Sequence, residues 1–131
     1  MFIPPGFARV SPYVIIENAD NLIVFMQRAF DAKPLHISHR TDGKVANAQM
    51  QIGDCQFMLS EASEACPPMP ASYYLYVEDA DKAVAQALKA SGELILEVSD
   101  RPYGDRQGGV RDPSGNLWWI SQRLASGPYQ D

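Results

Sequence analysis

The chain contains an internal repeat, and this repeat constrains the fold more than any other feature of the sequence. Residues 11–20 align with residues 72–81 at an offset of 61 positions, and five of the ten aligned pairs are identical. Unrelated segments of average composition would match at roughly one position in fifteen. The same offset, without a gap, aligns residues 57–60 with residues 118–121. The sequence therefore predicts two copies of one unit.

The two units are predicted to form a single domain, residues 1–131. The repeat places the units at residues 11–60 and 72–121, and residues 61–71 between them contain three prolines, which is typical of a linker. The acidic start of this linker, residues 61–64, is interpreted as a solvated segment. A chain of this length buries roughly two thirds of its surface, which is enough for one hydrophobic core.

Each unit is predicted to contain a strand, a helix and three further strands. Runs of β-branched and aromatic residues indicate the strands, and apolar residues at three- and four-residue spacing indicate the helix. An Asn or Asp residue before each helix is expected to supply the N-cap, and Ser91-Gly92 is expected to end the second helix. In the first unit, the strands are expected at residues 13–16, 35–40, 45–52 and 55–60. In the second unit, they are expected at residues 73–77, 93–98 and 117–121, whereas residues 101–111 are expected to be loop-like because they contain three glycines.

Glycine-containing turns at residues 42–43 and 53–54 are expected to fix the register of the first unit's sheet, because both suit two-residue hairpins. One face of that sheet is then apolar, includes Ala46 and Cys55, and should pack on the helix. The opposite face carries mostly polar side chains: His36, Ser38, Asn47, Gln49 and Met58. This polar face either points into water, or lines a cleft around which two such sheets curl.

Aromatic residues on the outer strands favour the cleft. Alternation along each strand places one set of side chains on the face remote from the helix: Ser11, Tyr13, Ser72, Tyr74 and Trp119. Two tyrosines and a tryptophan facing water would form an exposed apolar patch. A ligand pocket, by contrast, combines apolar and aromatic walls with a few neutral polar groups.

Other reactive side chains give weaker signals. His36 and His39 are expected on opposite faces of one strand, so they cannot chelate one metal ion together. Cys55 is interpreted as a small core residue and Cys66 as an exposed one. Trp118 is expected in the core, whereas Trp119 is the candidate for stacking on a ligand.

Composition excludes several classes of protein. The net charge is −5 and no run of Lys or Arg is present, which argues against a nucleic-acid partner. No apolar run reaches the roughly 18 residues of a membrane helix. The first residues lack the features of a signal peptide, so a cytoplasmic location is expected. The two cysteines are too few for a disulfide scaffold.

Motifs along residues 9–122 resemble the vicinal oxygen chelate superfamily, which includes glyoxalase I, the bleomycin resistance proteins and the extradiol dioxygenases. The resemblance rests on the paired βαβββ units, on Val-Glu-Asp-Ala-Asp at residues 77–81 and on Asp-Pro-Ser-Gly-Asn at residues 112–116. Tyr-Gly-Asp-Arg at residues 103–106 is similar to the PhnB-like branch. The implied fold is α+β, with two tandem βαβββ units forming a curved mixed sheet around a cleft. The resemblance also implies a homodimer, with the units paired either within or between chains.

The resemblance further implies where a metal ion would bind in this chain. Metal-dependent members use four ligands, usually His, Glu or Gln, and the matching positions here are Ser11, Met58, Ser72 and Trp119. None of these is a good ligand for a divalent metal. We therefore expect neither a metal ion nor a cofactor. In the PhnB-like branch, the loop with Tyr103 borders the cleft, so Arg106 either binds an anionic group or pairs with Asp105.

The function predicted from these observations is metal-free binding of a small molecule, in the manner of members that sequester antibiotics. An aromatic or cationic ligand would stack on Trp119, Tyr13 or Tyr74, while Asn47 and Gln49 would orient it by hydrogen bonds. One alternative is a lyase, isomerase or dioxygenase with a non-standard metal site, such as His36 with Gln49. Another is an interaction module whose cleft is filled by its own side chains. The tail, residues 125–131, is expected either to fray or to cover a partner's cleft.

Overall fold

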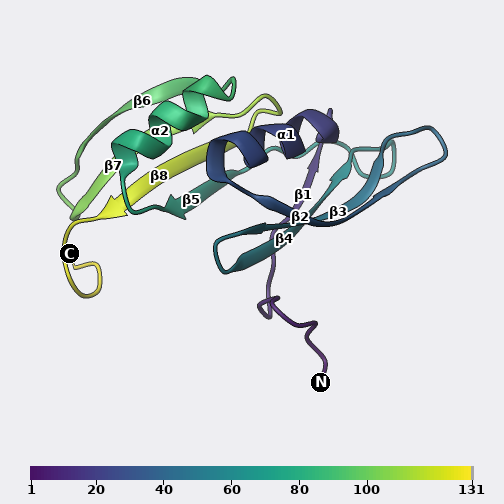
Figure 1. Ribbon diagram of the computed structural model, residues 1–131, viewed down its shortest axis with the longest axis horizontal. Helices are drawn as coiled ribbons and strands as arrows, with labels where there is room; N and C mark the ends of the chain where they lie inside the picture. The colour runs from purple at the N-terminus through teal and green to yellow at the C-terminus, as the bar shows by residue number, and fades with distance from the viewer. Residues whose placement is uncertain (131) are drawn as a thin grey trace.

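The computed structural model describes residues 1–130 and contains the predicted repeat of five elements. The first unit comprises β1 (Tyr13–Ile16), α1 (Ala19–Phe30), β2 (Lys33–His39), β3 (Val45–Ile52) and β4 (Cys55–Glu61) (Figure 1). The second unit comprises β5 (Ser72–Tyr76), α2 (Ala80–Lys89), β6 (Glu93–Asp100), β7 (Asp105–Arg111) and β8 (Leu117–Arg123). The prediction of two tandem βαβββ units in an α+β fold is confirmed.

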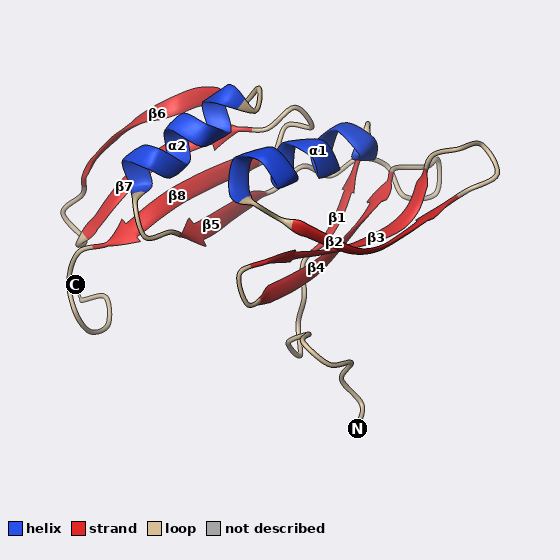
Figure 2. Ribbon diagram, in the orientation of Figure 1, coloured by secondary structure: helices blue, strands red, loops and turns tan. Residues whose placement is uncertain are grey.

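Each unit builds its own four-stranded mixed sheet. The strand orders are β1-β4-β3-β2 and β5-β8-β7-β6, so the two sheets have the same topology. The pairs β1–β4 and β5–β8 are parallel, because a helix intervenes after the first strand of each unit, and the remaining pairs are antiparallel. Both helices lie on the same side of the molecule and adjoin each other (Figure 2). Within residues 1–130, neither helix has the length and apolar composition to cross a membrane.

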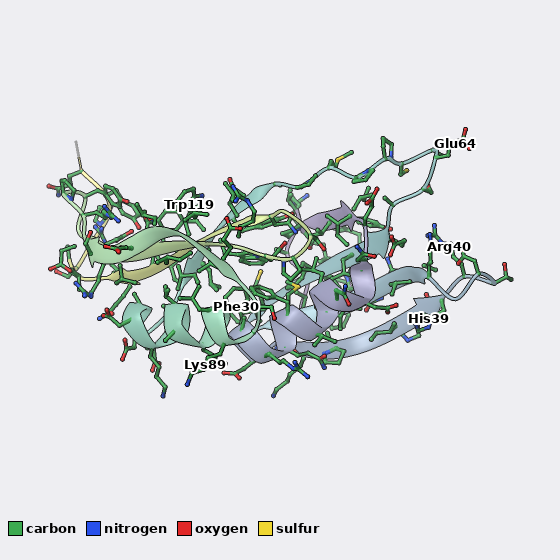
Figure 3. All side chains as sticks on the ribbon, turned by 90° about the horizontal axis from the view of Figure 1, so that it is seen from above. Phe30, His39, Arg40, Glu64, Lys89 and Trp119 are labelled. Carbon is green, nitrogen blue, oxygen red and sulfur yellow. The ribbon has the colours of Figure 1, made fainter. Side chains whose placement is uncertain are left out.

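The hydrophobic core lies between the helices and the sheet faces that they cover. Leu22, Phe25 and Met26 of α1 are buried, as is Ile120 of β8. Phe30, at the end of α1, lies where the two helices meet (Figure 3). Its ring centroid is 5.5 Å from that of Phe25 and 4.8 Å from that of Trp118. The two units therefore share one aromatic core, and Trp118 is buried as predicted.

The turn at residues 53–54 is the predicted two-residue hairpin, because Ile52 pairs with Cys55. The turn between β2 and β3 is longer than predicted, because Arg40 N donates to Lys44 O at 2.8 Å and three residues lie between them. Gln49 nevertheless pairs with both Met58 and His36, and Ser38 pairs with Asn47, as expected. A bulge after Ser38 then shifts the register, so that Val45 is fully buried and Ala46 is only partly buried. The expected alternation therefore holds along most of β3 but is wrong at its first two residues.

The expectation of a loop at residues 101–111 is wrong for its second half. Residues Asp105–Arg111 form β7, which pairs with β6 on one side and β8 on the other. Its glycines are required by close packing, since a Cβ atom on Gly108 would lie 2.8 Å from Val98 Cγ2, and one on Gly109 would lie 2.9 Å from Trp119 Cζ3. In a central strand, glycine can mark a close approach as well as a turn.

The two helices begin differently, although their preceding sequences align. Asp79 caps α2 as predicted, because its carboxylate accepts a hydrogen bond from Lys82 N at 3.1 Å. Asn18 has a left-handed backbone and makes no side-chain cap. Instead, the carboxylate of Glu61 accepts hydrogen bonds from Asn18 N and Ala19 N, both at 3.0 Å. Glu61 is thus the last residue of β4, and its side chain caps the N-terminus of α1. The assignment of Glu61 to a solvated linker is therefore wrong.

The expectation that Cys55 is a small core residue is wrong. Cys55 is exposed, because it is the first residue of β4 and lies beside the solvent-facing turn, whereas Cys66 is exposed as predicted. Ser91-Gly92 ends α2 as predicted, although the left-handed residue is Ser91, with φ of 85°, and not Gly92. Gly92 is needed for space, since a Cβ atom there would lie 2.5 Å from Val110 Cγ1.

The cap of α1 can be tested by removing its carboxylate. We expect Glu61→Ala to lower the free energy of unfolding by about 1 kcal/mol, because two backbone N–H groups lose their acceptor. Glu61→Gln, which keeps one side-chain acceptor, should lose less. Urea denaturation of each variant measures the effect, with Glu64→Ala in the exposed segment as the matched control. Equal stabilities for Glu61→Ala and Glu64→Ala would contradict this assignment.

Candidate functional site

Each sheet has one face turned away from its helix, and these two surfaces carry most of the predicted site residues. We call the face of β1-β4-β3-β2 remote from α1 the N-terminal open face. The face of β5-β8-β7-β6 remote from α2 is the C-terminal open face. Neither face has a helix packed against it, so functional side chains on them are free to meet a ligand.

A row of four side chains crosses the N-terminal open face. Strand pairing places Tyr13 beside Met58, Met58 beside Gln49, and Gln49 beside His36. The row is thus aromatic at one end and polar at the other. Tyr13 has 51% of its surface exposed, and His36 is also exposed.

The next row of this face adds Asn47 and Ser38. Asn47 Nδ2 lies 3.8 Å from Met58 Sδ, and Ser38 Oγ donates a hydrogen bond to Asn47 O at 3.3 Å. Six predicted site residues are therefore brought together here. His39 pairs with the buried Val45 and so belongs to the helix side of the sheet, which separates it from His36 as predicted.

An aromatic surface crosses the C-terminal open face at the corresponding level. Tyr74 pairs with Trp119, Trp119 pairs with Gly109, and Gly109 pairs with Leu96. Figure 3 shows Trp119 on the side of the sheet away from the helices. Because the Trp119 ring occupies the space where a Gly109 side chain would lie, it rests against the sheet. Its outer ring face is then a flat surface held in place by packing.

A row of buried polar groups lies beside this aromatic surface. Gln107 Nε2 donates a hydrogen bond to Ser121 Oγ at 2.8 Å, and Tyr103 OH donates one to Gln107 Oε1. Gln107 and Ser121 are almost entirely buried. A fully paired buried network of this kind is rigid, because any movement leaves a polar group unsatisfied.

Asp105 is the most buried charged residue of the C-terminal open face, with no exposed surface. Its carboxylate accepts hydrogen bonds from Tyr74 OH, from Tyr129 OH at 2.6 Å and from Arg123 Nη1 at 3.0 Å. Burial alone would raise the pKa of Asp105, but the hydrogen bonds from Tyr129, Tyr74 and Arg123 outweigh it and hold the pKa below its usual value. Burial, followed by the hydrogen bond to Asp105, raises the pKa of Tyr74.

Arg106 is separated from the other predicted site residues. Its guanidinium forms a two-pronged ion pair with Asp81 of α2, at 2.7 and 3.0 Å, and a third contact with Asp100 at 2.9 Å. Alternation along β7 turns Arg106 toward the helix side, while Asp105 faces the open side. Of the two roles left open for Arg106, the pair with Asp105 is therefore wrong, and Arg123 takes that place.

The tail, which was expected either to fray or to cover a partner's cleft, contacts its own chain. Residues 124–130 curl back at the end of β8 (Figure 1), and Tyr129 reaches Asp105 of its own chain. Asp131 lies outside the described residues. Three residues of this cluster, Asp105, Arg123 and Tyr129, were missed as site residues. Placing Asp105 required β7 to be recognised as a strand, and nothing in the sequence signals the contact of Tyr129.

An apolar groove separates the two units. It has a volume of about 370 Å³ and lies between β1, the β3–β4 turn and β5. Val14, Phe57 and Leu75 contribute apolar walls, and Tyr74 and Tyr76 lie at its border with the C-terminal open face. The aromatic residues of that open face are thus continuous with a concave surface.

The four positions at which the resemblance implies metal ligands carry side chains that do not fit a divalent metal ion. They carry Ser11, Met58, Ser72 and Trp119, of which the indole cannot coordinate and the thioether suits only soft ions. Strand pairing places Tyr13, and not Ser11, beside Met58, and Leu117 beside Ser72. Among residues 1–130, no group of three His, Cys, Asp or Glu side chains is placed to hold a metal ion.

The tandem units and their open faces define a fold shared with many known proteins. The chain belongs to the Glyoxalase/Bleomycin resistance protein/Dioxygenase superfamily, whose family model matches residues 7–120. A relative from Mycobacterium bovis, Uncharacterized protein Mb0911c, is 30% identical over 124 residues, which cover 86% of this chain and 82% of the relative.

Solved structures share the fold at lower identity. TioX from Micromonospora sp. ML1 superposes with a TM-score of 0.75 and 21% identity, covering 89% of this chain and 99% of TioX. The PhnB protein from Bacillus cereus superposes with a TM-score of 0.70 and 18% identity, covering 88% of this chain and 99% of that protein. These similarities establish the fold of the chain and leave its ligand to be argued from the site.

The buried carboxylate of Asp105 makes stability depend on pH. Asp105→Asn should lower the free energy of unfolding at neutral pH by about 2 kcal/mol, because an amide cannot accept from three donors without presenting its own N–H groups to them. The pKa of Asp105 is lower in the folded state than its ordinary value of 3.8. The wild type is therefore more stable than Asp105→Asn by the full amount at pH values above 3.8, and this difference in the free energy of unfolding is lost as the pH falls through the folded-state pKa. Urea denaturation of both proteins, from neutral pH down into the acid range, measures this difference, and Asp54→Asn at an exposed position is the control. A constant difference between wild type and Asp105→Asn at all pH values would contradict the role of the carboxylate.

Proposed function

We propose that this protein binds a small planar aromatic compound without a metal ion and sequesters it. The observation that carries the proposal is the aromatic surface of Tyr74 and Trp119 on the C-terminal open face. Trp119 stands at one of the positions at which the resemblance implies a metal ligand in metal-dependent members. The name of the superfamily includes bleomycin resistance proteins, so an antibiotic-like compound is the class of ligand that we favour.

Preorganisation of Trp119 supports this proposal. Its ring rests against Gly109, where any side chain would collide with it. A ring that is already fixed loses little conformational entropy when a ligand stacks on it. Tyr74 extends the surface, because its hydroxyl is held by Asp105 while 44% of the residue remains exposed. An aromatic ligand would therefore meet two rings whose positions are set before binding.

The N-terminal open face supplies the complementary polar groups of the proposed site. Gln49 and Asn47 present neutral amides that can orient a ligand, and Met58 offers an adaptable apolar contact.

We place the chain in the PhnB-like branch and in the cytoplasm, and we propose that it works as a homodimer.

The alternative is an enzyme with a metal ion bound at His36. The pairing of His36 with Gln49 is the observation that favours it, since these two side chains share one row of the N-terminal open face. Two donors are fewer than a metal ion needs for tight binding, so further ligands would have to come from a substrate or a second chain. Metal content of the purified protein distinguishes this alternative from the proposal.

Proflavine, a planar cationic aromatic dye, tests the proposed function. We expect it to bind the wild type equally well with and without EDTA, and Trp119→Ala to weaken binding by roughly tenfold, because the main stacking surface is lost. Trp119→Phe should retain most of the affinity. Fluorescence anisotropy measures binding, and Val24→Ala on the exposed side of α1 is the control. An affinity that is unchanged in Trp119→Ala, or that disappears with EDTA, would overturn the proposal.

A further inference from the structure

The C-terminal tail occupies part of the C-terminal open face. Tyr129 is the only tail residue that reaches the buried carboxylate of Asp105 among the residues described, 1–130. The same hydroxyl lies 2.6 Å from Tyr76 OH. The ring of Tyr129 lies against the guanidinium of Arg123, whose Cζ atom is 4.0 Å from the ring centroid. One phenol group is thus held by a carboxylate, a second phenol and a cation.

Beyond Leu124, whose N–H group donates to Gly104 O at 2.9 Å, the contacts that hold the rest of the tail are weak. Arg123 Nη2 is 3.4 Å from Gly127 O and 3.4 Å from Pro128 O, at the long end of hydrogen-bonding distance. Residues 124–130 are exposed, and Tyr129 itself has 47% of its surface in contact with solvent. Segments with few buried contacts open locally at low free-energy cost. The tail can therefore leave the sheet without disturbing the core.

Departure of Tyr129 would leave a binding subsite with defined chemistry. Asp105 would keep Arg123 and Tyr74 as partners but would lose one donor, and Arg123 would lose the ring that covers it. A carboxylate with a missing donor favours a ligand that brings a hydroxyl group. An uncovered guanidinium favours a ligand that brings an aromatic ring. A phenol carries both in one rigid unit.

We propose that this subsite binds hydroxyaryl compounds, and that Tyr129 is an internal substitute for such a ligand. The ligand's hydroxyl would donate to Asp105 and accept from Tyr76, and its ring would lie against Arg123. Tyr74 connects the subsite to Trp119, because its hydroxyl reaches Asp105 while its backbone pairs with Trp119. The inference rests on the proposed function, to which it adds the ligand's chemical class and the competition with the tail.

Competition between tail and ligand predicts a gain in affinity when the tail is removed. If the tail is seated in about nine-tenths of the molecules, the full chain binds roughly tenfold more weakly than a chain without it. The probe is p-cresol, which has the shape of a tyrosine side chain. We expect Tyr129→Ala, and a chain that ends at Ser126, to bind p-cresol roughly tenfold more tightly than the full chain.

Ligand-observed NMR titration measures these affinities, after circular dichroism has shown that each variant is folded. Gln130→Ala is the matched control, because it changes the neighbouring tail residue and keeps Tyr129. Toluene, which lacks the hydroxyl, should show no comparable gain, and Asp105→Asn combined with Tyr129→Ala should lose the gain. Equal affinities of the full and shortened chains, no binding to any of them, or an equal gain for toluene would each overturn the inference.

The two proposals can fail separately. Proflavine binding that depends on Trp119, without any effect of the tail on p-cresol, would leave the proposed function standing and reject the inference. A p-cresol gain in the shortened chain, with no proflavine binding to the wild type, would support the hydroxyaryl subsite and reject stacking on Trp119.

Discussion

The buried carboxylate of Asp112 fixes the geometry on which the candidate site depends. It accepts hydrogen bonds from the backbone N–H groups of Ser114 and Asn116, from Asn116 Nδ2 and from Trp118 Nε1, at 2.8 to 3.0 Å. Asn116 in turn accepts from Ala71 N, which ties the β7–β8 turn to the start of β5. Because the bond to Trp118 holds that indole on the helix side, alternation turns Trp119 to the open face. An error of one residue at this turn would exchange the two tryptophans and remove the aromatic surface.

Much of this arrangement could be predicted from the sequence, because its causes are local. The turn at residues 53–54 sets the pairing of Ile52 with Cys55, and the pairing of Met58 with Gln49 follows from it. The pairing of Gln49 with His36 depends on the other turn, between β2 and β3. The repeat transfers the same topology to the second unit. What could not be predicted depends on contacts between distant segments. Glu61 caps a helix that lies more than forty residues earlier in the chain, and the glycines of β7 indicate a loop until Trp119 is placed against them.

The two units use equivalent positions for different chemistry. In the first sheet, Gln49 lies between Met58 and His36 and fills its position with a polar amide. In the second sheet, Gly109 takes the equivalent place, and the Trp119 ring covers it. The duplication thus preserved the backbone pairing, while the exchange of one amide for a glycine made room for a large flat ring. One open face thus carries hydrogen-bonding groups, and the other carries a flat aromatic surface.

Charge on the C-terminal open face is balanced locally, and this decides what kind of ligand the face favours. The net charge of −5 would suggest a cationic partner, but Asp105 is paired with Arg123 at 3.0 Å and contributes no unbalanced charge. Exposed acidic residues elsewhere are screened by salt over about 10 Å and act weakly on this surface. A ligand therefore gains more from stacking on Trp119 and from a hydroxyl aimed at Asp105 than from a positive charge. The shape of the ring and the position of one donor therefore set the specificity of the proposed site.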